Sequence, residues 1–140
     1  MNTSFAAPMS SLSRTQRFVL EQFLSGMIER INGAEGAMLA TADGFPSAFS
    51  GALDETMQNR VAAVMSSLCA LGEAAGAQID AGGLEIISLQ FSDRQMQVVS
   101  IRGERSDYVL ALVARADVLL GSSLWAIREC ATQIRESLRP

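Results

Sequence analysis

The residues that most often carry out chemistry in proteins are scarce in this chain of 140 residues. It contains no histidine and no lysine, and its two cysteines are Cys69 and Cys130. Without histidine or lysine it cannot build a serine–histidine–aspartate site, a cysteine–histidine site, a Schiff base, a histidine metal site or a phosphate-binding loop lysine. We therefore expect a protein that is not an enzyme and that uses no metal ion or cofactor.

The remaining candidates for chemistry have simpler structural interpretations. Gly33-Ala-Glu-Gly36 looks like a phosphate loop, but it precedes a predicted strand and not the start of a helix. Asp43 stands beside Gly44 in a turn between two apolar runs, and this turn accounts for it. Both cysteines lie in apolar or small-residue stripes at helical spacing, where thiols are usually buried and inert. The sequence thus points to binding and not to catalysis.

Composition and charge limit the class of protein further. Eleven arginines are outnumbered by fifteen acidic residues, and the resulting net charge of −4 argues against a nucleic-acid surface. The hydrophobic fraction of 49 % is typical of one globular domain of this length. The apolar stretches fall short of the roughly 20 residues that a membrane span needs. No secretory signal pattern and no disulfide framework is evident, so we expect a cytoplasmic protein without a membrane span.

Hydrophobic periodicity and turn residues predict three helices and five strands. Ser13 is a suitable N-cap for the first helix and Asp54 for the second. An Asp-Gly pair between apolar runs predicts a hairpin after the first helix, and short loops predict an antiparallel meander after the second. The predicted elements are helix 13–31, strands 36–41 and 45–50, helix 54–76, strands 84–91, 96–101 and 108–114, and helix 118–138.

The predicted order, αββαβββα, is that of an α/β fold of the α+β type with one five-stranded antiparallel sheet. Several strands carry apolar residues toward both faces. In the third strand we expect Leu84 and Ile86 on one face and Ile87, Leu89 and Phe91 on the other. Such a sheet needs helices on both faces. Residues 1–12 are small and polar and are expected to form a flexible arm before a domain at 13–140.

This helix–hairpin–helix block with its following meander resembles the roadblock/dynein light chain family. The resemblance rests on Gly36, the Asp43-Gly44 turn, Gly83 before the third strand and Gly121 near the start of the last helix, and it extends over about residues 15–138. It implies a profilin-like fold with the first and last helices on one face of the sheet and the middle helix on the other. It also implies a homodimer that is a bacterial partner of Ras-like small GTPases.

The middle predicted helix carries the candidate interaction surface. We expect its apolar stripe, which includes Met57, Val64 and Leu71, to pack on the sheet. The opposite side consists of small residues, and no charge occurs between Val61 and Gly72, so a second helix is expected to pack there. The family resemblance adds the third strand to this interface. The predicted dimer-interface residues are Ala62, Ala63, Ser66, Ala70, Leu84 and Ile86, and the predicted partner-binding residues are Asn59, Arg60 and Ser67.

The sequence therefore favours a non-enzymatic homodimeric adaptor that binds and regulates a Ras-like small GTPase. Two alternatives remain open. One is a small-molecule sensory domain, because a two-sided sheet with a central helix can enclose a pocket, although only 6 % of the residues are aromatic. The other is a structural scaffold subunit with no GTPase partner.

Overall fold

The computed structural model describes residues 12–140 and contains the eight predicted elements in the predicted order. The predicted arm lies outside the described residues except for Leu12, which packs against the core. The elements are α1 (Arg14–Arg30), β1 (Ala34–Thr41), β2 (Pro46–Gly51), α2 (Glu55–Gln78), β3 (Ile86–Gln90), β4 (Arg94–Arg102), β5 (Asp107–Arg115) and α3 (Leu120–Ser137).

The five strands form one sheet in the order β2-β1-β5-β4-β3, and every neighbouring pair is antiparallel. The predicted meander is confirmed, since β3, β4 and β5 are neighbours in both sequence and space. The longest of its pairings joins β4 to β5 from Arg94 opposite Arg115 to Arg102 opposite Asp107. The two edges of the sheet are β2 and β3.

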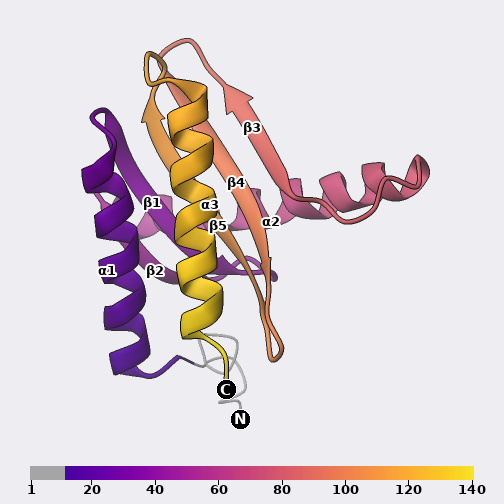
Figure 1. Ribbon diagram of the computed structural model, residues 1–140, viewed down its shortest axis with the longest axis horizontal. Helices are drawn as coiled ribbons and strands as arrows, with labels where there is room; N and C mark the ends of the chain where they lie inside the picture. The colour runs from indigo at the N-terminus through magenta and orange to yellow at the C-terminus, as the bar shows by residue number, and fades with distance from the viewer. Residues whose placement is uncertain (1–11) are drawn as a thin grey trace.

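Helices cover both faces of the sheet, as predicted. Figure 1 shows α1 and α3 side by side on one face, and α2 crossing the other face behind the strands. Because successive side chains of a strand alternate between faces, adjacent residues of β1 enter different cores. Leu39 belongs to the core under α1 and α3, whereas Met38 belongs to the core under α2. The sheet thus has one core on each face, and packing in the second core positions α2 on the strands.

The local signals for the helix starts are confirmed by hydrogen bonds. The Ser13 Oγ accepts from the Gln16 amide at 3.1 Å, and the Gln16 Oε1 accepts from the Ser13 amide at 2.9 Å, which is a complete capping box. The Asp54 Oδ1 accepts from the Met57 amide at 2.9 Å at the start of α2. Both helices therefore begin at the residue after their predicted cap.

The third strand begins later than predicted, at Ile86. Ile86 packs against the α1–α3 core, whereas Leu84 packs with Ile87 against the α2 core. The prediction that Leu84 and Ile86 share a face is therefore wrong. Strict alternation holds only within an extended strand, and Leu84 lies before the strand, in a segment that follows Gly82 with its φ of +85°.

Candidate protein-interaction surface

Helix α2 is long, and most of its surface is not covered by the rest of the chain. Of its 24 residues only Ala62, Met65 and Cys69 are buried. These three are spaced three and four positions apart, so they form one narrow stripe that faces the sheet. Figure 1 shows that the C-terminal part of α2 continues past β3, the edge strand, and projects beyond the sheet. The helix is thus built to present most of its circumference outward.

The apolar stripe that we expected to pack on the sheet is instead largely exposed. Met57 is 46 % exposed, Val64 57 % and Leu71 68 %, while Leu68 beside them is half-buried. The prediction for this stripe is wrong because helical periodicity marks an apolar face without saying what covers it. The stripe that does face the strands, which contains Met65, has the same periodicity. We call Met57, Val64, Leu68 and Leu71 the apolar flank of α2.

The small residues predicted for the interface lie on a different side of α2 from the apolar flank. Ala62 is fully buried in the chain's own core, so a second copy of the chain cannot reach its side chain. Ala63 and Ala70 are exposed. Ser66 is half-buried, and its Oγ donates a hydrogen bond to the Ala42 carbonyl in the turn between β1 and β2. We call Ala63, Ser66 and Ala70 the small-residue flank; Ser66 anchors it to the hairpin.

The apolar flank continues from α2 onto the segment that leads into β3. A Cβ atom at Gly72 would lie 2.9 Å from the Leu84 Cδ2 and 3.5 Å from the Ile87 Cδ1. The absence of a side chain at Gly72 therefore lets both residues pack close to the helix. Leu84 and Ile87 are half-buried against the core under α2. One apolar surface thus joins α2 to the third strand.

The third strand offers an open edge to this surface. Within residues 12–140 it pairs with β4 alone, from Ile86 opposite Val99 to Gln90 opposite Gln95. A strand at an edge carries amide and carbonyl groups that are free to pair with another strand. Its residues are half-buried or exposed, unlike those of the buried central strand β5. The predicted interface residue Ile86 is therefore at the start of an edge that a further strand can join.

Polar contacts of Glu73 hold the segment between α2 and β3 in place. The Leu84 amide donates to the Glu73 Oε1 at 3.1 Å, and the Glu73 Oε2 pairs with the Arg102 Nη2. The Leu84 hydrogen bond, and after it the Arg102 guanidinium, hold the pKa of the Glu73 carboxyl below its ordinary value. One carboxylate thereby connects α2, the segment before β3 and the end of β4.

The predicted partner-binding residues all lie on the exposed surface of α2. Asn59, Arg60 and Ser67 are exposed. Arg60 and Ser67 are two helical turns apart and therefore point to the same side, away from the sheet. Arg60 makes no salt bridge to any residue of 12–140. Its guanidinium is therefore available to a carboxylate or phosphate of a partner.

Neither cysteine has the surroundings of a reactive thiol. Burial raises the pKa of Cys130 to about 12, and its Sγ lies 3.7 Å from the Phe23 carbonyl, to which it donates a weak hydrogen bond. Burial also raises the pKa of Cys69, a smaller opposing effect coming from Ser100. The predicted burial of both thiols is confirmed. Residues 12–140 contain no group of three or more histidine, cysteine or acidic residues that could hold a metal ion.

By length and composition alone, α2 also meets the criterion for a membrane-spanning helix, although we expected no stretch of the sequence to do so. It has a mean hydropathy of 1.2 over its most apolar stretch, of which 17 % is buried. The same values result when one side of an apolar helix packs on a sheet and its other sides stay exposed. The contact of Ala62, Met65 and Cys69 with the core favours that explanation of the hydropathy.

Comparison with known proteins agrees with this architecture. A search of curated protein sequences finds no match. Among solved structures, a Roadblock/LC7 domain from Streptomyces avermitilis is similar with a TM-score of 0.77 and 23 % identity, covering 84 % of this chain and 96 % of that one. An MglB structure described as having a tetrameric arrangement gives a TM-score of 0.80 at 19 % identity, covering 90 % and 92 % of the two chains.

The gliding protein MglB from Thermus thermophilus gives a TM-score of 0.76 at 19 % identity, covering 89 % of this chain and 94 % of that chain. At these identities the likeness is one of fold. The sequence itself matches the family model of the Roadblock/LC7 domain over residues 20–114, from within α1 to the end of β5 and so over more than half of its length. The chain therefore belongs to the Roadblock/LC7 domain family.

Proposed function

We propose that this protein is a homodimeric, non-enzymatic adaptor that binds and regulates a Ras-like small GTPase. The observation that carries the proposal is the exposed apolar flank of α2 beside the open edge of β3, in a chain of the Roadblock/LC7 domain family. Val64 and Leu71 are each more than half exposed. Burying an aliphatic side chain of this size is worth about 1.5–3 kcal/mol, so a partner that covers them gains appreciable free energy.

The first partner in this proposal is a second copy of the chain. A two-fold interface is self-complementary, so each copy contributes the same flank and the same strand edge. The β3 strands of two copies can pair along their open edges, while the two α2 helices lie next to each other across the joined sheet. In this arrangement the apolar flank, Leu84 and Ile86 are in or beside the interface, and Ala63, Ser66 and Ala70 allow the helix backbones to approach.

The second partner is the GTPase, and family membership supports its assignment. The outward side of α2 keeps Asn59, Arg60 and Ser67 as hydrogen-bonding groups beside apolar surface. A tenfold preference for one nucleotide state requires only about 1.4 kcal/mol of differential contact. One arginine whose partner group moves between the two states of the GTPase can supply that difference.

The test measures binding of the purified protein to each Ras-like GTPase of the same organism, loaded with a GTP analogue or with GDP. We expect one GTPase to bind with at least tenfold preference for one state. Arg60→Ala is expected to weaken this binding, whereas Arg17→Ala, an exposed arginine on α1 at the other face, is the matched control and should not. Undetectable binding of every GTPase in both states contradicts the proposal and favours the scaffold function.

A further inference from the structure

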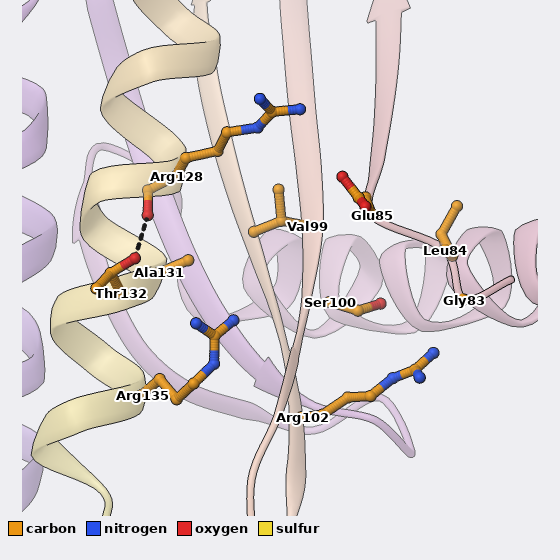
Figure 2. Close-up of a pocket in the computed structure, with 10 residues that line it drawn as sticks. All are labelled: Gly83, Leu84, Glu85, Val99, Ser100, Arg102, Arg128, Ala131, Thr132 and Arg135. Atoms are coloured by element: carbon orange, nitrogen blue, oxygen red, sulfur yellow. Dashed lines mark hydrogen bonds between the residues drawn. The ribbon is translucent and has the colours of Figure 1, made fainter.

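An arginine-lined groove lies between α3 and the segment that leads into β3, at the edge of the sheet. It has a volume of about 500 Å³. One wall is α3, with Arg128 and Arg135, and the other is the segment before β3 together with Arg102. Figure 2 shows the Arg128 and Arg135 side chains extending from α3 toward the strands, with Val99 between them and Glu85 across the groove. The groove shares Leu84 with the interface proposed above, but its arginines on α3 take no part in that interface.

The groove concentrates positive charge on an acidic protein. Its lining holds three arginines and one acidic residue, Glu85, whereas the whole chain has a net charge of −4. Arg102 is neutralised in part by Glu73. Arg128 and Arg135 make no salt bridge to any residue of 12–140. Two free guanidinium groups therefore face the same open space.

The walls of the groove are shaped by specific contacts. A Cβ atom at Gly83 would lie 3.0 Å from both terminal nitrogens of Arg102, so a glycine lets the guanidinium lie against this segment. The Glu73 carboxylate holds the same guanidinium from the side of α2. The floor is apolar and small, formed by Val99 and Ala131. A polypeptide can thus pass between the arginines and contact an apolar floor.

The spacing of the charges distinguishes between classes of anion. Arg128 and Arg135 are seven residues apart on one helix, which separates their Cα atoms by roughly 10 Å along its axis. A single phosphate is too small to satisfy charges so far apart, whereas carboxylates spaced along a peptide are not. Arg135 also lies in the last turn of α3, where the helix dipole opposes a concentrated negative charge. Within residues 12–140 no helix of eight or more residues begins at this groove, so no helix N-terminus is present there to bind a phosphate.

We infer that this groove is a docking site for an acidic segment of a partner protein, held by Arg128 and Arg135 and seated on Val99 and Ala131. α3, Val99 and Ala131 are on the opposite face of the sheet from α2, whereas Leu84 and Arg102 at the other wall contact residues on the α2 side. Because Arg128 and Arg135 are on α3 and the outward side of α2 is on the other face, a partner held by these arginines leaves Asn59, Arg60 and Ser67 of α2 uncovered. This inference does not depend on the identity of the partner at α2, and either proposal can fail alone.

The experiment measures binding of a short fluorescein-labelled peptide of alternating glutamate and alanine by fluorescence anisotropy at low ionic strength. The control for binding that does not depend on negative charge is the same peptide with glutamine in place of glutamate. We expect the glutamate peptide to bind and the glutamine peptide not to bind. Replacing the two groove arginines of α3, Arg128→Ala with Arg135→Ala, should weaken binding at least tenfold, because each exposed ion pair accounts for up to about fivefold. The matched control removes Arg105 and Arg139, exposed arginines outside the lining.

A second readout locates the peptide on the folded protein. In a proton–nitrogen correlation spectrum, the side-chain Nε–H signals of Arg128 and Arg135 and the amides of Gly83 and Thr132 are expected to shift on titration. Three results would overturn the inference: equal loss of binding in the control variant, equal binding of the glutamine peptide, or shifts confined to α2. Complete displacement of the peptide by inorganic phosphate at equal concentration would show an anion site instead and would also overturn it.

Discussion

The Leu84 amide donates a hydrogen bond to the Glu73 Oε1 at 3.1 Å, and this contact joins the projecting end of α2 to the segment that enters β3. Glu73 also pairs with Arg102, which lines one wall of the groove between α3 and the segment before β3. One carboxylate therefore contacts Leu84, a residue of the proposed dimer interface, and Arg102, a residue of the groove. Glu73 thus ties α2 to the segment that precedes the edge strand.

Removing this carboxylate should loosen the segment before β3. Glu73→Ala is expected to increase the exchange rate of the Leu84 amide proton several-fold, because the amide loses its acceptor. Glu73→Gln keeps an amide oxygen in the same place and should preserve most of the protection. Hydrogen exchange followed by NMR measures both variants. Unchanged protection of Leu84 in Glu73→Ala would mean that the hydrogen bond does not hold this segment.

The same contact predicts a direction of pH dependence. The folded pKa of Glu73 is lowered from its ordinary value of 4.5, so the ionised form is favoured in the folded state. Its stabilising contribution is complete above that ordinary value and is lost only as the pH falls through the lower folded pKa. Protection of the Leu84 amide, corrected for the intrinsic exchange rate, should therefore persist at pH 4.5 in the wild type. In Glu73→Gln, the corrected protection of the Leu84 amide should not depend on pH around this value.

Substitutions on α2 distinguish its two flanks as parts of the proposed dimer interface. Leu71→Arg places a charge in the apolar flank and should shift the dimer toward monomer at micromolar concentration, because an unpaired buried charge costs several kcal/mol. Ala70→Arg, its neighbour on the small-residue flank, should have a smaller effect if the apolar flank is central. Light scattering with a concentration series measures the distribution of masses.

The folded monomer itself should tolerate Leu71→Arg, since Leu71 is 68 % exposed within one chain. Circular dichroism of the monomeric variant is the control for folding. A wild-type protein that is monomeric at these concentrations would contradict the interface proposal. Dissociation by Ala70→Arg without dissociation by Leu71→Arg would assign the interface to the small-residue flank instead.

Two glycines provide an opposed pair of stability predictions. At Gly51, where φ is +129°, a Cβ atom would lie 2.7 Å from the Glu35 carbonyl oxygen and 2.8 Å from the Gly36 Cα. Gly51→Ala should therefore destabilise the fold by about 2 kcal/mol or more. Gly26 lies inside α1, and a Cβ atom there would meet no atom within 4 Å, so Gly26→Ala should stabilise by about 0.5–1 kcal/mol. Urea denaturation measures both changes, and equal shifts of the two variants would contradict the prediction.

The buried Cys130 thiol predicts both low reactivity and a loss of stability at high pH. Its pKa is raised from 9.0 to about 12 by burial, so the folded protein should resist iodoacetamide at pH 8 until denaturant is added. The unfolded chain releases this proton near pH 9 and the folded chain does not. The contribution of the neutral Cys130 thiol to the free energy of unfolding is therefore complete below pH 9 and is lost as the pH rises toward 12.

Cys130→Ala serves as the control because it removes the titrating thiol. The variant should be less stable at neutral pH, since a buried side chain is shortened, but its stability should fall less steeply between about pH 9 and pH 11. Alkylation of Cys130 in the native wild type at pH 8, detected by mass spectrometry, would contradict the burial on which the prediction depends.

The sequence alone determined the element order, the starts of the first two helices and the need for helices on both faces. These features depend on residues close together in the chain. Ser13 and Gln16 complete a capping box three positions apart, and Met38 and Leu39 enter different cores because neighbours in a strand alternate. The family resemblance rested on the element order and on Gly36, the Asp43-Gly44 turn, Gly83 and Gly121, and the match over residues 20–114 confirms it.

Only the tertiary structure decided which side of α2 faces the sheet and where the arginines gather. Two stripes of α2 had equal helical periodicity, and contact with Met38 and Val98 in the core selected the one containing Met65. Periodicity reports an apolar side but not its neighbour. Arg102 of β4 and Arg135 of α3 line the same groove. No local sequence pattern predicts that residues so far apart in the chain will lie close together. Burial and charge at a surface depend on distances in space, which the order of residues encodes only through the completed fold.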